Sequence, residues 1–494
     1  VFLVMALVSV AILLCAGCSF LMNDPDDVVV RFYLCGGVPF LLSLIGFVLS
    51  RPKSPEQRQA GLREGFAIVG LSWMAASVLG ALPYLATVRM HWYDALFESV
   101  SGFTTTGASI LSPGFPLANG DVLVKGIESL SHGLLFWRAT TQWLGGMGII
   151  VLALAVLPLF NIGGQALYNA ETPGVKGMDN QIAPRIASSA KILWLAYVFL
   201  TLCETIVLLL GGMSFFDSLC HSFATISTGG FSTKTASVAH YDSVYLEVVL
   251  TVFMFLSGCN FYLHFRLITG RPLQYLKDAE FRFYSGLILI CSAIVAVALA
   301  FTSFRHDFWN GLLKSVFQVV SIITSTGFTS ADYMLWPSVA VVILMWLMIV
   351  GGCGGSTSGG VKCVRVLVLW KQGVQEVRKC IFPRMVSGVH MNGRRVEEST
   401  VRKTLAFASL YTLTIAVFAL LLAAVCPQAD FVTAFSASAT SLSNSGPGVG
   451  LLGPSGSFGW MNPAGKTLLA FEMILGRLEL YTIFVMFLPS FWRR

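Results

Sequence analysis

Charged residues are scarce in this sequence. They make up 12% of its 494 residues, while hydrophobic residues make up 55%. A soluble domain carries about 25% charged residues. The balance therefore excludes an ordinary soluble protein and predicts that most of the chain lies in lipid or in protein at membrane depth.

Side-chain groups that carry catalytic chemistry are scarce as well. The seven histidines form no HExxH or other metal-ligand spacing, and the sequence shows no catalytic dyad. A membrane enzyme that acts on lipid or peptide needs such a group at the membrane surface. That class is therefore disfavoured, and we expect a protein that is not an enzyme and has no organic cofactor.

Eleven cysteines are scattered mostly through apolar runs, where packing is the simplest role for them. Cys15 and Cys18 form a C-x-x-C, but no second pair or nearby histidine completes a metal site. The match of this tetrapeptide to a lipoprotein cleavage site is imperfect. The first apolar run has about twenty residues and no basic leader, which favours a membrane span over a signal peptide.

Long apolar segments are abundant. About twenty residues cross roughly 30 Å of lipid as a helix, and only residues 336–370 are too many for one span. The ten segments lie near residues 1–21, 30–50, 65–87, 134–160, 186–211, 243–267, 283–301, 336–370, 404–425 and 465–489. They predict an all-α, multi-pass protein in contact with membrane lipid.

Lysine and arginine gather in alternate connections between these segments. The net charge is +7, but in a membrane protein this charge reports topology, and no nucleic-acid partner is expected. The basic segments are residues 51–63, 161–191, 266–282, 362–403 and 493–494. Ten spans place all of them on one side, which predicts that both termini are cytoplasmic.

Four shorter apolar segments, each of about a dozen residues, cannot cross a membrane and end in related tracts. The segments are LFESVSGFTTTG (Leu96–Gly107), SLCHSFATISTG (Ser218–Gly229), VFQVVSIITSTG (Val316–Gly327) and FSASATSLSNSG (Phe435–Gly446). Each follows one full span and precedes another, which predicts a unit of span, half-helix, turn and span repeated four times. The expected divisions are a two-span hairpin at 1–62 and pore repeats at 63–165, 166–275, 276–385 and 386–494.

The polar ends of these segments are candidate ion ligands. Half-helices aimed inward would turn the negative ends of their dipoles towards a cavity and favour a cation. Glycine permits backbone angles that turn carbonyl oxygens towards an axis, where they replace the hydration shell of an ion. One such tract is better explained as a polar loop, whereas four equivalent copies favour a pore. The candidate ligands are Thr105, Thr106, Gly107, Ser227, Thr228, Gly229, Ser325, Thr326, Gly327, Asn444, Ser445 and Gly446.

The full spans after the four tracts can also be aligned, with Gly146, Gly258, Gly352 and Arg477 at one position. The third continues as a glycine-rich loop, which cannot hold a helix because each glycine costs about 1 kcal/mol relative to alanine. We expect two half-helices joined by a loop at membrane depth, with a slack loop outside the membrane as the alternative. The spacing does not match a phosphate-binding loop. The candidate gate residues are Gly351, Gly352, Gly354, Gly355, Ser356, Thr357, Ser358, Gly359, Gly360 and Arg477.

Arg477 lies in mid-span, where an arginine without partners or water costs at least about 2.5 kcal/mol. Glu472 and Glu479 share a helix face that Arg477 does not. We expect Arg477 to face the pore beside the glycine-rich loop, whose carbonyls accept its hydrogen bonds; a salt bridge between helices is the alternative. Glu98 either raises the local cation concentration or supports its tract by hydrogen bonding, and Glu204 receives no role.

Together these features resemble a known family. The tracts TTTGAS (Thr104–Ser109), STGGFST (Ser227–Thr233), STGFTS (Ser325–Ser330) and SNSGPG (Ser443–Gly448) resemble the four filter sequences of the TrkH subunits of bacterial potassium uptake systems, in the Trk/Ktr/HKT superfamily. The glycine-rich loop and Arg477 resemble that family's intramembrane gate loop and the arginine of its last pore span. The resemblance covers the whole chain, and the two extra N-terminal spans fit TrkH better than KtrB.

The resemblance implies a gated potassium channel or transporter of the bacterial inner membrane, which carries K⁺, often rubidium and some sodium. It further implies a homodimer with one pore per protomer and a cytosolic TrkA-type regulatory subunit that binds nucleotide. The implied filter glycines are Gly107, Gly229, Gly327 and Gly446. Gly107 favours potassium, because a serine there accompanies sodium preference in plant relatives. A sodium-preferring or weakly selective monovalent cation transporter is the alternative, since Asn444 and Pro447 break the symmetry of the ring. Passive flux and proton coupling both stay open.

Overall fold

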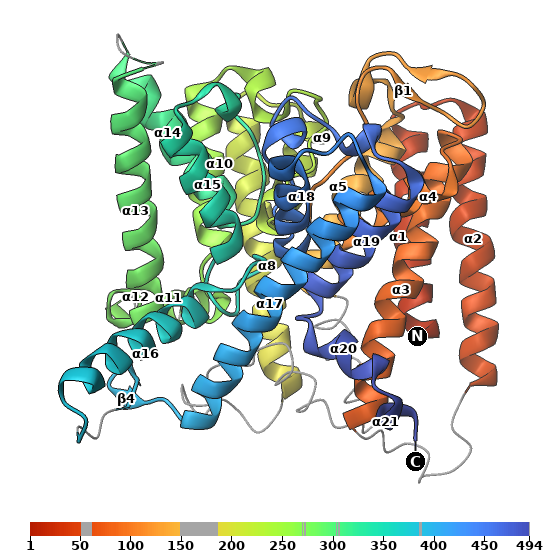
Figure 1. Ribbon diagram of the computed structural model, residues 1–494. Coiled ribbons are helices and arrows are strands. Elements are labelled where there is room, and N and C mark those ends of the chain that lie inside the picture. The colour runs from red at the N-terminus through yellow and green to blue at the C-terminus, as the bar shows by residue number, and fades with distance from the viewer. Residues whose placement is uncertain are drawn as a thin grey trace.

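The computed structural model describes residues 1–50, 62–148, 186–268, 270, 273–302, 304, 307–384 and 388–493. Within these ranges the chain is mostly helical, and Figure 1 shows the long helices side by side in one bundle. Six of the described helices are long and apolar enough to cross a membrane, or seven if one bent pair is a single span. The predicted all-α, multi-pass class is confirmed.

Strands are confined, in the described ranges, to two hairpins of two-residue strands. The first pairs β1 (Phe115–Pro116) with β2 (Val122–Leu123), and the second pairs β3 (His390–Met391) with β4 (Arg394–Arg395). Short 3-10 helices occupy connections at η2 (Gly126–Ser129), η4 (Ser237–Tyr241), η5 (Tyr333–Leu335), η6 (Gly450–Leu452) and η7 (Phe458–Trp460).

The first two spans form a hairpin of α1 (Phe2–Leu21) and α2 (Asp26–Leu49). Asp24, in the connection between them, accepts hydrogen bonds from Ser19 Oγ at 2.6 Å and from the backbone N–H of Gly133 at 2.9 Å. Burial alone raises the pKa of Asp24, but hydrogen bonds from Ser19, Gly133 and His132 outweigh it and hold the pKa below its usual value. The ionised Asp24 therefore fixes the hairpin to the helix that begins at His132.

The described helices then follow the predicted order of outer span, half-helix and inner helix four times. The outer spans are α3 (Leu62–Thr87), α8 (Ile186–Leu210), α13 (Ala279–Ala300) and α17 (Glu398–Val425). The half-helices are α4 (Trp92–Phe103), α9 (Phe215–Ile226), α14 (Phe308–Ile323) and α18 (Phe431–Ser443). The inner helices are α5 (His132–Gly146), α10 (Val244–Ser257), α15 (Ser338–Val350) and α19 (Pro463–Arg477).

Each inner helix ends within two residues of the aligned glycine or arginine. The break after Val350 was predicted, whereas the helix breaks within the spans predicted at 243–267 and 465–489 were not. Beyond Ser257 the next helix turns away by 101°, and beyond Arg477 both Glu479 and Leu480 have positive φ. The helices that follow the breaks are α11 (Phe261–Ile268), α12 (Leu273–Lys277), α16 (Cys363–Ile381), α20 (Tyr481–Phe487) and α21 (Pro489–Trp492).

The breaks escape a hydropathy scan because apolar residues continue across them, while the freed backbone groups find distant partners. The carbonyl of Gly258 accepts the N–H of Cys353 at 2.9 Å, and Asn260 Oδ1 accepts the N–H of Tyr262 at 2.9 Å to start α11. Non-helical backbone at membrane depth is tolerated when it is satisfied in this way.

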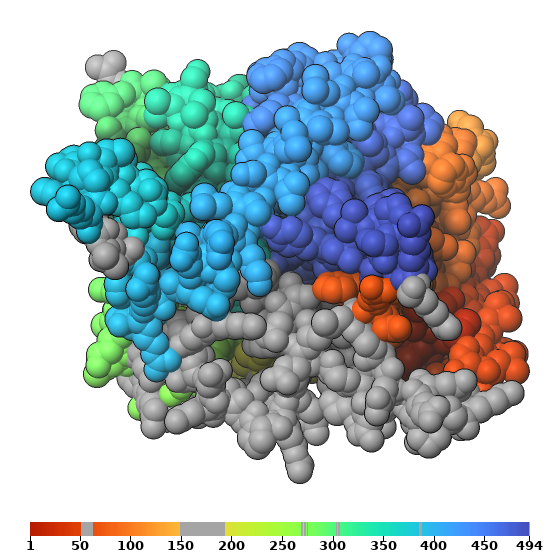
Figure 2. All heavy atoms as spheres, turned by 60° about the horizontal axis from the view of Figure 1, so that its bottom comes forward, coloured from red at the N-terminus to blue at the C-terminus, as the bar shows by residue number. Residues whose placement is uncertain are grey.

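Both termini, α12, α16 and β4 lie at the lower end of the bundle in Figure 1. Figure 2 brings this end forward and shows the blue C-terminal segment beside the orange start of α3, where Arg63 Nη1 donates to the Arg493 carbonyl at 2.8 Å. The described parts of the basic segments 266–282 and 362–403 therefore share one side with both termini, as predicted.

Some predictions fall outside the described residues. They are the second half of the span at 134–160, most of the basic segments 51–63 and 161–191, and the divisions at 165–166 and 385–386.

Candidate functional site

The four half-helices end in the same backbone turn. A left-handed residue follows each of them, with φ of +54° or +55° at Thr105, Thr228, Ser325 and Asn444. In the first turn, Thr105 N–H donates to Gly102 O at 3.0 Å, as in a Schellman motif, and equivalent bonds recur in the other three. Threonine and serine rarely adopt this conformation, which costs about 1–2 kcal/mol per residue. Strain at the three threonine and serine positions indicates a functional site, and Asn444 adopts the same conformation at the fourth as a residue type that tolerates it.

A glycine with positive φ lies two residues further along each turn. The values are +78° at Gly107, +78° at Gly230, +81° at Gly327 and +89° at Gly446. In the second turn this glycine is Gly230, not the predicted Gly229. The equivalent second tract is therefore Thr228–Gly230, and Ser227 caps its half-helix as Thr104 caps the first.

The misplaced register has a simple cause. The tract Ser227–Gly230 contains two adjacent glycines, and matching its S-T-G to the S-T-G of the third tract aligns the first of them. The following residue carries the correct signal, because Gly230-Phe231 and Gly327-Phe328 match.

The four turns form a closed ring. A Cβ atom placed on Gly327 would lie 2.5 Å from the carbonyl oxygen of Ser445, and one on Gly446 would lie 2.7 Å from that of Thr106. In the same way, a Cβ on Gly107 would collide with the carbonyl of Gly229, and one on Gly230 with that of Thr326. Each glycine thus lies against a carbonyl of the next turn, and the fourth turn returns to the first. Only glycine allows this approach.

Hydroxyl groups of the half-helices brace three of the turns. Ser101 Oγ donates to the carbonyl of Ala108 at 2.6 Å, and Ser321 Oγ donates to that of Phe328 at 2.6 Å. Thr440 makes the equivalent bond in the fourth turn, at 3.1 Å.

The second turn is braced from another helix, because Ala224 replaces the hydroxyl residue of its half-helix. Gln142 of α5 donates from Nε2 to the carbonyl of Gly229 at 2.7 Å and accepts the N–H of Phe231 at 3.0 Å. The sequence prediction did not include Gln142, although a polar side chain inside an apolar span was a signal for it.

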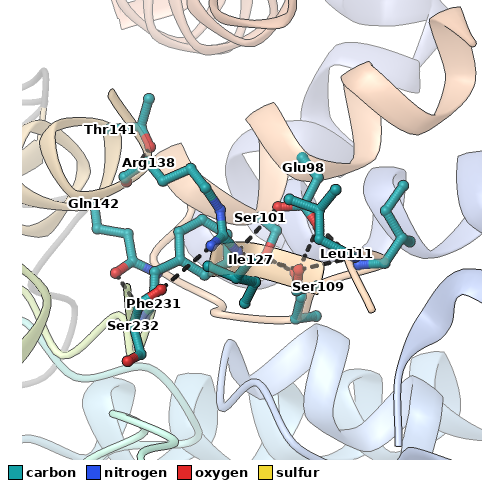
Figure 3. A network of polar contacts seen from close by, with 12 residues as sticks. Glu98, Ser101, Ser109, Leu111, Ile127, Arg138, Thr141, Gln142, Phe231 and Ser232 are labelled. Atoms are coloured by element: carbon teal, nitrogen blue, oxygen red, sulfur yellow. Dashed lines mark hydrogen bonds and ion pairs between the residues drawn. The ribbon is translucent and has the colours of Figure 1, made fainter. Parts of the chain in front are cut away.

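A buried ion pair connects the first two turns (Figure 3). Arg138 Nη2 lies 3.4 Å from Glu98 Oε2 and donates to Ser109 Oγ at 3.1 Å. On its other side, Arg138 Nη1 donates to the carbonyl of Ser232 at 3.4 Å, and its guanidinium lies 4.1 Å from the ring centre of Phe231. Glu98 is 0% exposed and paired, so its charge supports the turns rather than attracting cations. Arg138 was missed by the sequence prediction despite its position in an apolar span.

Two further buried ion pairs occupy equivalent positions with reversed charge. Lys466 Nζ of α19 bonds Asp94 Oδ1 of α4 at 2.6 Å, and Lys314 of α14 bonds Glu247 of α10. Asp94 and Lys314 stand at the same place in their half-helices, as do Lys466 and Glu247 in their inner helices. Each pair joins one half-helix to the inner helix of the preceding repeat in the ring.

This reversal yields a prediction about stability. Asp94→Asn is expected to destabilise the protein by about 2 kcal/mol, because the buried Lys466 loses its counter-charge. The exchange Asp94→Lys with Lys466→Asp should recover most of the loss, since the other pair already has that arrangement. Thermal unfolding in detergent measures both variants; a double variant less stable than Asp94→Asn would contradict the equivalence.

The glycine-rich loop after α15 touches the ends of three half-helices. Gly359 N–H donates to Ser325 Oγ at 2.7 Å, and Thr357 Oγ1 donates to the carbonyl of Ile226 at 3.0 Å. A Cβ atom on Gly359 would collide with the carbonyl of Ser443, at the end of the fourth half-helix. The loop is therefore not a slack extramembrane loop but lies against the ring, with Thr357 2% exposed.

Arg477 connects this loop to the first repeat. Its Nη1 donates to the carbonyl of Thr357 at 2.9 Å, and its Nη2 donates to the carbonyls of Gly145 and Gly146 at 2.6 and 2.8 Å. The predicted hydrogen bond from Arg477 to a loop carbonyl is thus present. Glu479 bonds instead to Arg365 at 2.5 Å.

The four half-helices end in turns that form one closed ring, and the glycine-rich loop lies against this ring. This arrangement defines a multi-pass membrane protein of the pore-loop class. The family described as TrkH, cation transport protein, matches residues 40–494, and the chain belongs to this family. The family predicted from the sequence is confirmed, and its description is one of transport rather than catalysis.

Named relatives cover nearly the whole chain. The Trk system potassium uptake protein TrkH of Salmonella typhimurium is 40% identical over 457 residues, 92% of this chain and 91% of the relative. That of Vibrio parahaemolyticus is 37% identical over 496 residues, 97% and 98% of the two chains. The crystal structure of the potassium transporter TrkH from Vibrio parahaemolyticus matches with a TM-score of 0.86 at 35% identity, over 100% of this chain and 98% of that one.

Proposed function

We propose that this chain is a gated pathway for potassium uptake and that the ring of four turns selects the ion. The closed contact between each glycine and a carbonyl of the next turn carries this proposal. Half-helices that end at the ring direct the negative ends of their dipoles towards it, and carbonyl oxygens replace the hydration shell of a cation. The names of the relatives, which are potassium uptake proteins, support potassium as the transported ion.

The proposed filter residues are those predicted from the sequence, with one adjustment. In the second turn the equivalent residues are Thr228, Gly229 and Gly230, so Gly230 joins Gly107, Gly327 and Gly446 as a filter glycine. Ser227 becomes the residue that caps the half-helix.

We further propose that the loop at Gly351–Gly360 and Arg477 form the gate. The loop lies against the ends of three half-helices. Arg477, from the fourth repeat, joins the loop to the end of α5 in the first repeat. A guanidinium beside the pathway opposes a passing cation, and the loop has the glycine content needed to move.

We propose the location from the basic face, which is the side of the molecule that carries the described parts of the basic segments 266–282 and 362–403 and both termini. By the positive-inside rule, this face and both termini lie on the cytoplasmic side of the membrane, which we propose is a bacterial inner membrane. The names of the relatives describe a Trk system, which supports other Trk components as partners. As the family resemblance implies, we propose a homodimer with one pore per protomer and a TrkA-type nucleotide-binding subunit on the cytosolic face.

Ion substitution in proteoliposomes tests the proposal. Potassium flux is expected to exceed sodium flux when either ion is the only permeant cation, because the ring replaces the hydration shell of a potassium ion. Protein-free liposomes give the background. Sodium flux well above potassium flux would favour the sodium-preferring alternative instead.

A further inference from the structure

Glu280, at the start of α13, joins the glycine-rich loop to the start of α16 through one oxygen atom. Its Oε1 accepts the N–H of Gly354 at 2.6 Å and the N–H of Val364 at 2.9 Å. Gly354 lies in the first limb of the loop, whereas Val364 lies in the first turn of α16. Glu280 is 8% exposed and Val364 is buried, so the Val364 N–H would lack a partner without Glu280.

The residues just before Glu280 are held in turn by the β3–β4 hairpin. Asn392, at the tip of this hairpin, donates from Nδ2 to Asp278 Oδ2 at 3.0 Å and accepts the N–H of Ala279 at 2.7 Å. Asn392 and Gly393 have φ of +49° and +76°, as a tight Asn-Gly hairpin turn requires. The turn therefore presents the Asn392 amide to the N-terminus of α13.

The hairpin is itself firmly placed on the basic face. Lys371 Nζ of α16 donates to the carbonyl of His390 at 2.7 Å, and Val389 is buried with Val368 of α16 and Val401 of α17. Hydrogen bonds thus connect the exposed hairpin to the first residues of α13. Glu280, the next residue of the chain, is hydrogen-bonded to the loop beside the ring.

We infer that Glu280 is a positioning residue for the glycine-rich loop and that the β3–β4 hairpin, through Asn392, fixes Glu280 in place. The two act as one anchor that holds the loop against the half-helix ends from the side of the basic face. This inference rests on the proposed gating function of the loop. Because the anchor lies away from the ring, its loss changes how often the pathway is open and leaves ion preference unchanged.

Four variants of the full chain test the anchor in proteoliposomes. Glu280→Ala removes the acceptor of both N–H groups, and potassium leak is expected to rise about tenfold as the loop leaves its closed position more often. Glu280→Gln should stay near the wild-type level, because an amide oxygen accepts the same two bonds. Asn392→Ala should raise the leak less than Glu280→Ala, and the two together no more than Glu280→Ala alone.

Glu376→Gln is the matched control. Glu376 is an exposed carboxylate of α16 whose partners are Lys379 and Gln372 on its own helix, and its replacement should leave the leak unchanged. Hydrogen exchange gives a second readout that does not depend on transport: amides of residues 351–366 should exchange faster in Glu280→Ala and Asn392→Ala, but not in the control.

Wild-type leak and exchange in a folded Glu280→Ala protein would overturn the inference, and so would a Glu280→Gln protein that behaves like Glu280→Ala. Should Glu280→Ala not fold, Asn392→Ala at the exposed hairpin decides the matter through the same exchange measurement. Arg477→Ala, measured alongside, distinguishes a failure of the anchor from a failure of the proposed gate. If its leak rises while that of Glu280→Ala does not, the anchor fails and the gate stands; if neither rises, the proposed gate fails as well.

Discussion

Gly230→Ala is expected to lower potassium flux by at least about tenfold, because an L-residue at this φ costs about 1–2 kcal/mol before any collision is counted. The added methyl group would collide with the carbonyl of Thr326 in the next turn. That carbonyl belongs to the backbone of the ring and cannot rotate away like a flexible side chain. Flux of ⁸⁶Rb⁺ or K⁺ into proteoliposomes measures the effect.

Gly229→Ala is the neighbouring comparison. A Cβ atom there would meet the side-chain amide of Gln142, which can move, and Gly229 is not among the residues with positive φ. This variant should retain more flux than Gly230→Ala, while Gly286→Ala, which adds a methyl group in open space on α13, should match the wild type. A Gly229→Ala protein with the greater loss would restore the register predicted from the sequence.

The four half-helices were predictable because their signal is local. An apolar run too short to cross a membrane, followed by hydroxyl residues and glycine, recurs at the same point of each repeat, and the structure places α4, α9, α14 and α18 there. The register of one turn was not predictable in the same way, because two adjacent glycines at Gly229 and Gly230 satisfy the same short pattern. The backbone angles distinguish them, and the sequence favours Gly230 only through the phenylalanine that follows it, as one follows Gly327.

The contacts that hold the ring could be anticipated only in part. Arg138 and Gln142 are polar side chains within an apolar span, and the rule that singled out Arg477 applied equally to them. Their partners are non-local: Gln142 reaches a turn 87 positions along the chain. No periodicity within one helix reports such a contact. The reversed pairs Asp94–Lys466 and Glu247–Lys314 likewise become visible only when the repeats are superposed.

The helix breaks at Ser257 and Arg477 were missed for a different reason. Hydropathy measures whether a residue tolerates lipid, and the segments on either side of these breaks are apolar. A break at membrane depth requires partners for the freed N–H and carbonyl groups. After Ser257 the glycine-rich loop and α11 supply them, whereas after Arg477 the N–H groups of Leu478 and Leu480 bond carbonyls of α19 itself. In the third repeat the break was predictable, because the glycine-rich segment itself disfavours a helix.

Arg477→Ala is expected to raise potassium leak by about tenfold, which corresponds to a shift of about 1.4 kcal/mol in the balance between closed and open loop. Two effects act in the same direction. The loop loses the hydrogen bond that Arg477 donates to the carbonyl of Thr357, and the positive charge beside the pathway disappears. In addition, the carbonyls of Gly145 and Gly146 at the C-terminus of α5 lose their cationic partner. The negative end of the α5 helix dipole then becomes available to a cation.

Arg477→Lys separates the charge of this residue from its hydrogen bonds. Lysine keeps the positive charge, but its single ammonium group cannot reproduce the planar fork with which Arg477 reaches Thr357 on one side and Gly145 and Gly146 on the other. If the bridge between loop and inner helix keeps the pathway closed, Arg477→Lys should leak nearly as much as Arg477→Ala; if the charge alone is the barrier, it should resemble the wild type. Unchanged or reduced leak in a folded Arg477→Ala protein, with the ring still selecting potassium over sodium, would remove Arg477 from the gate and leave closure to the loop itself.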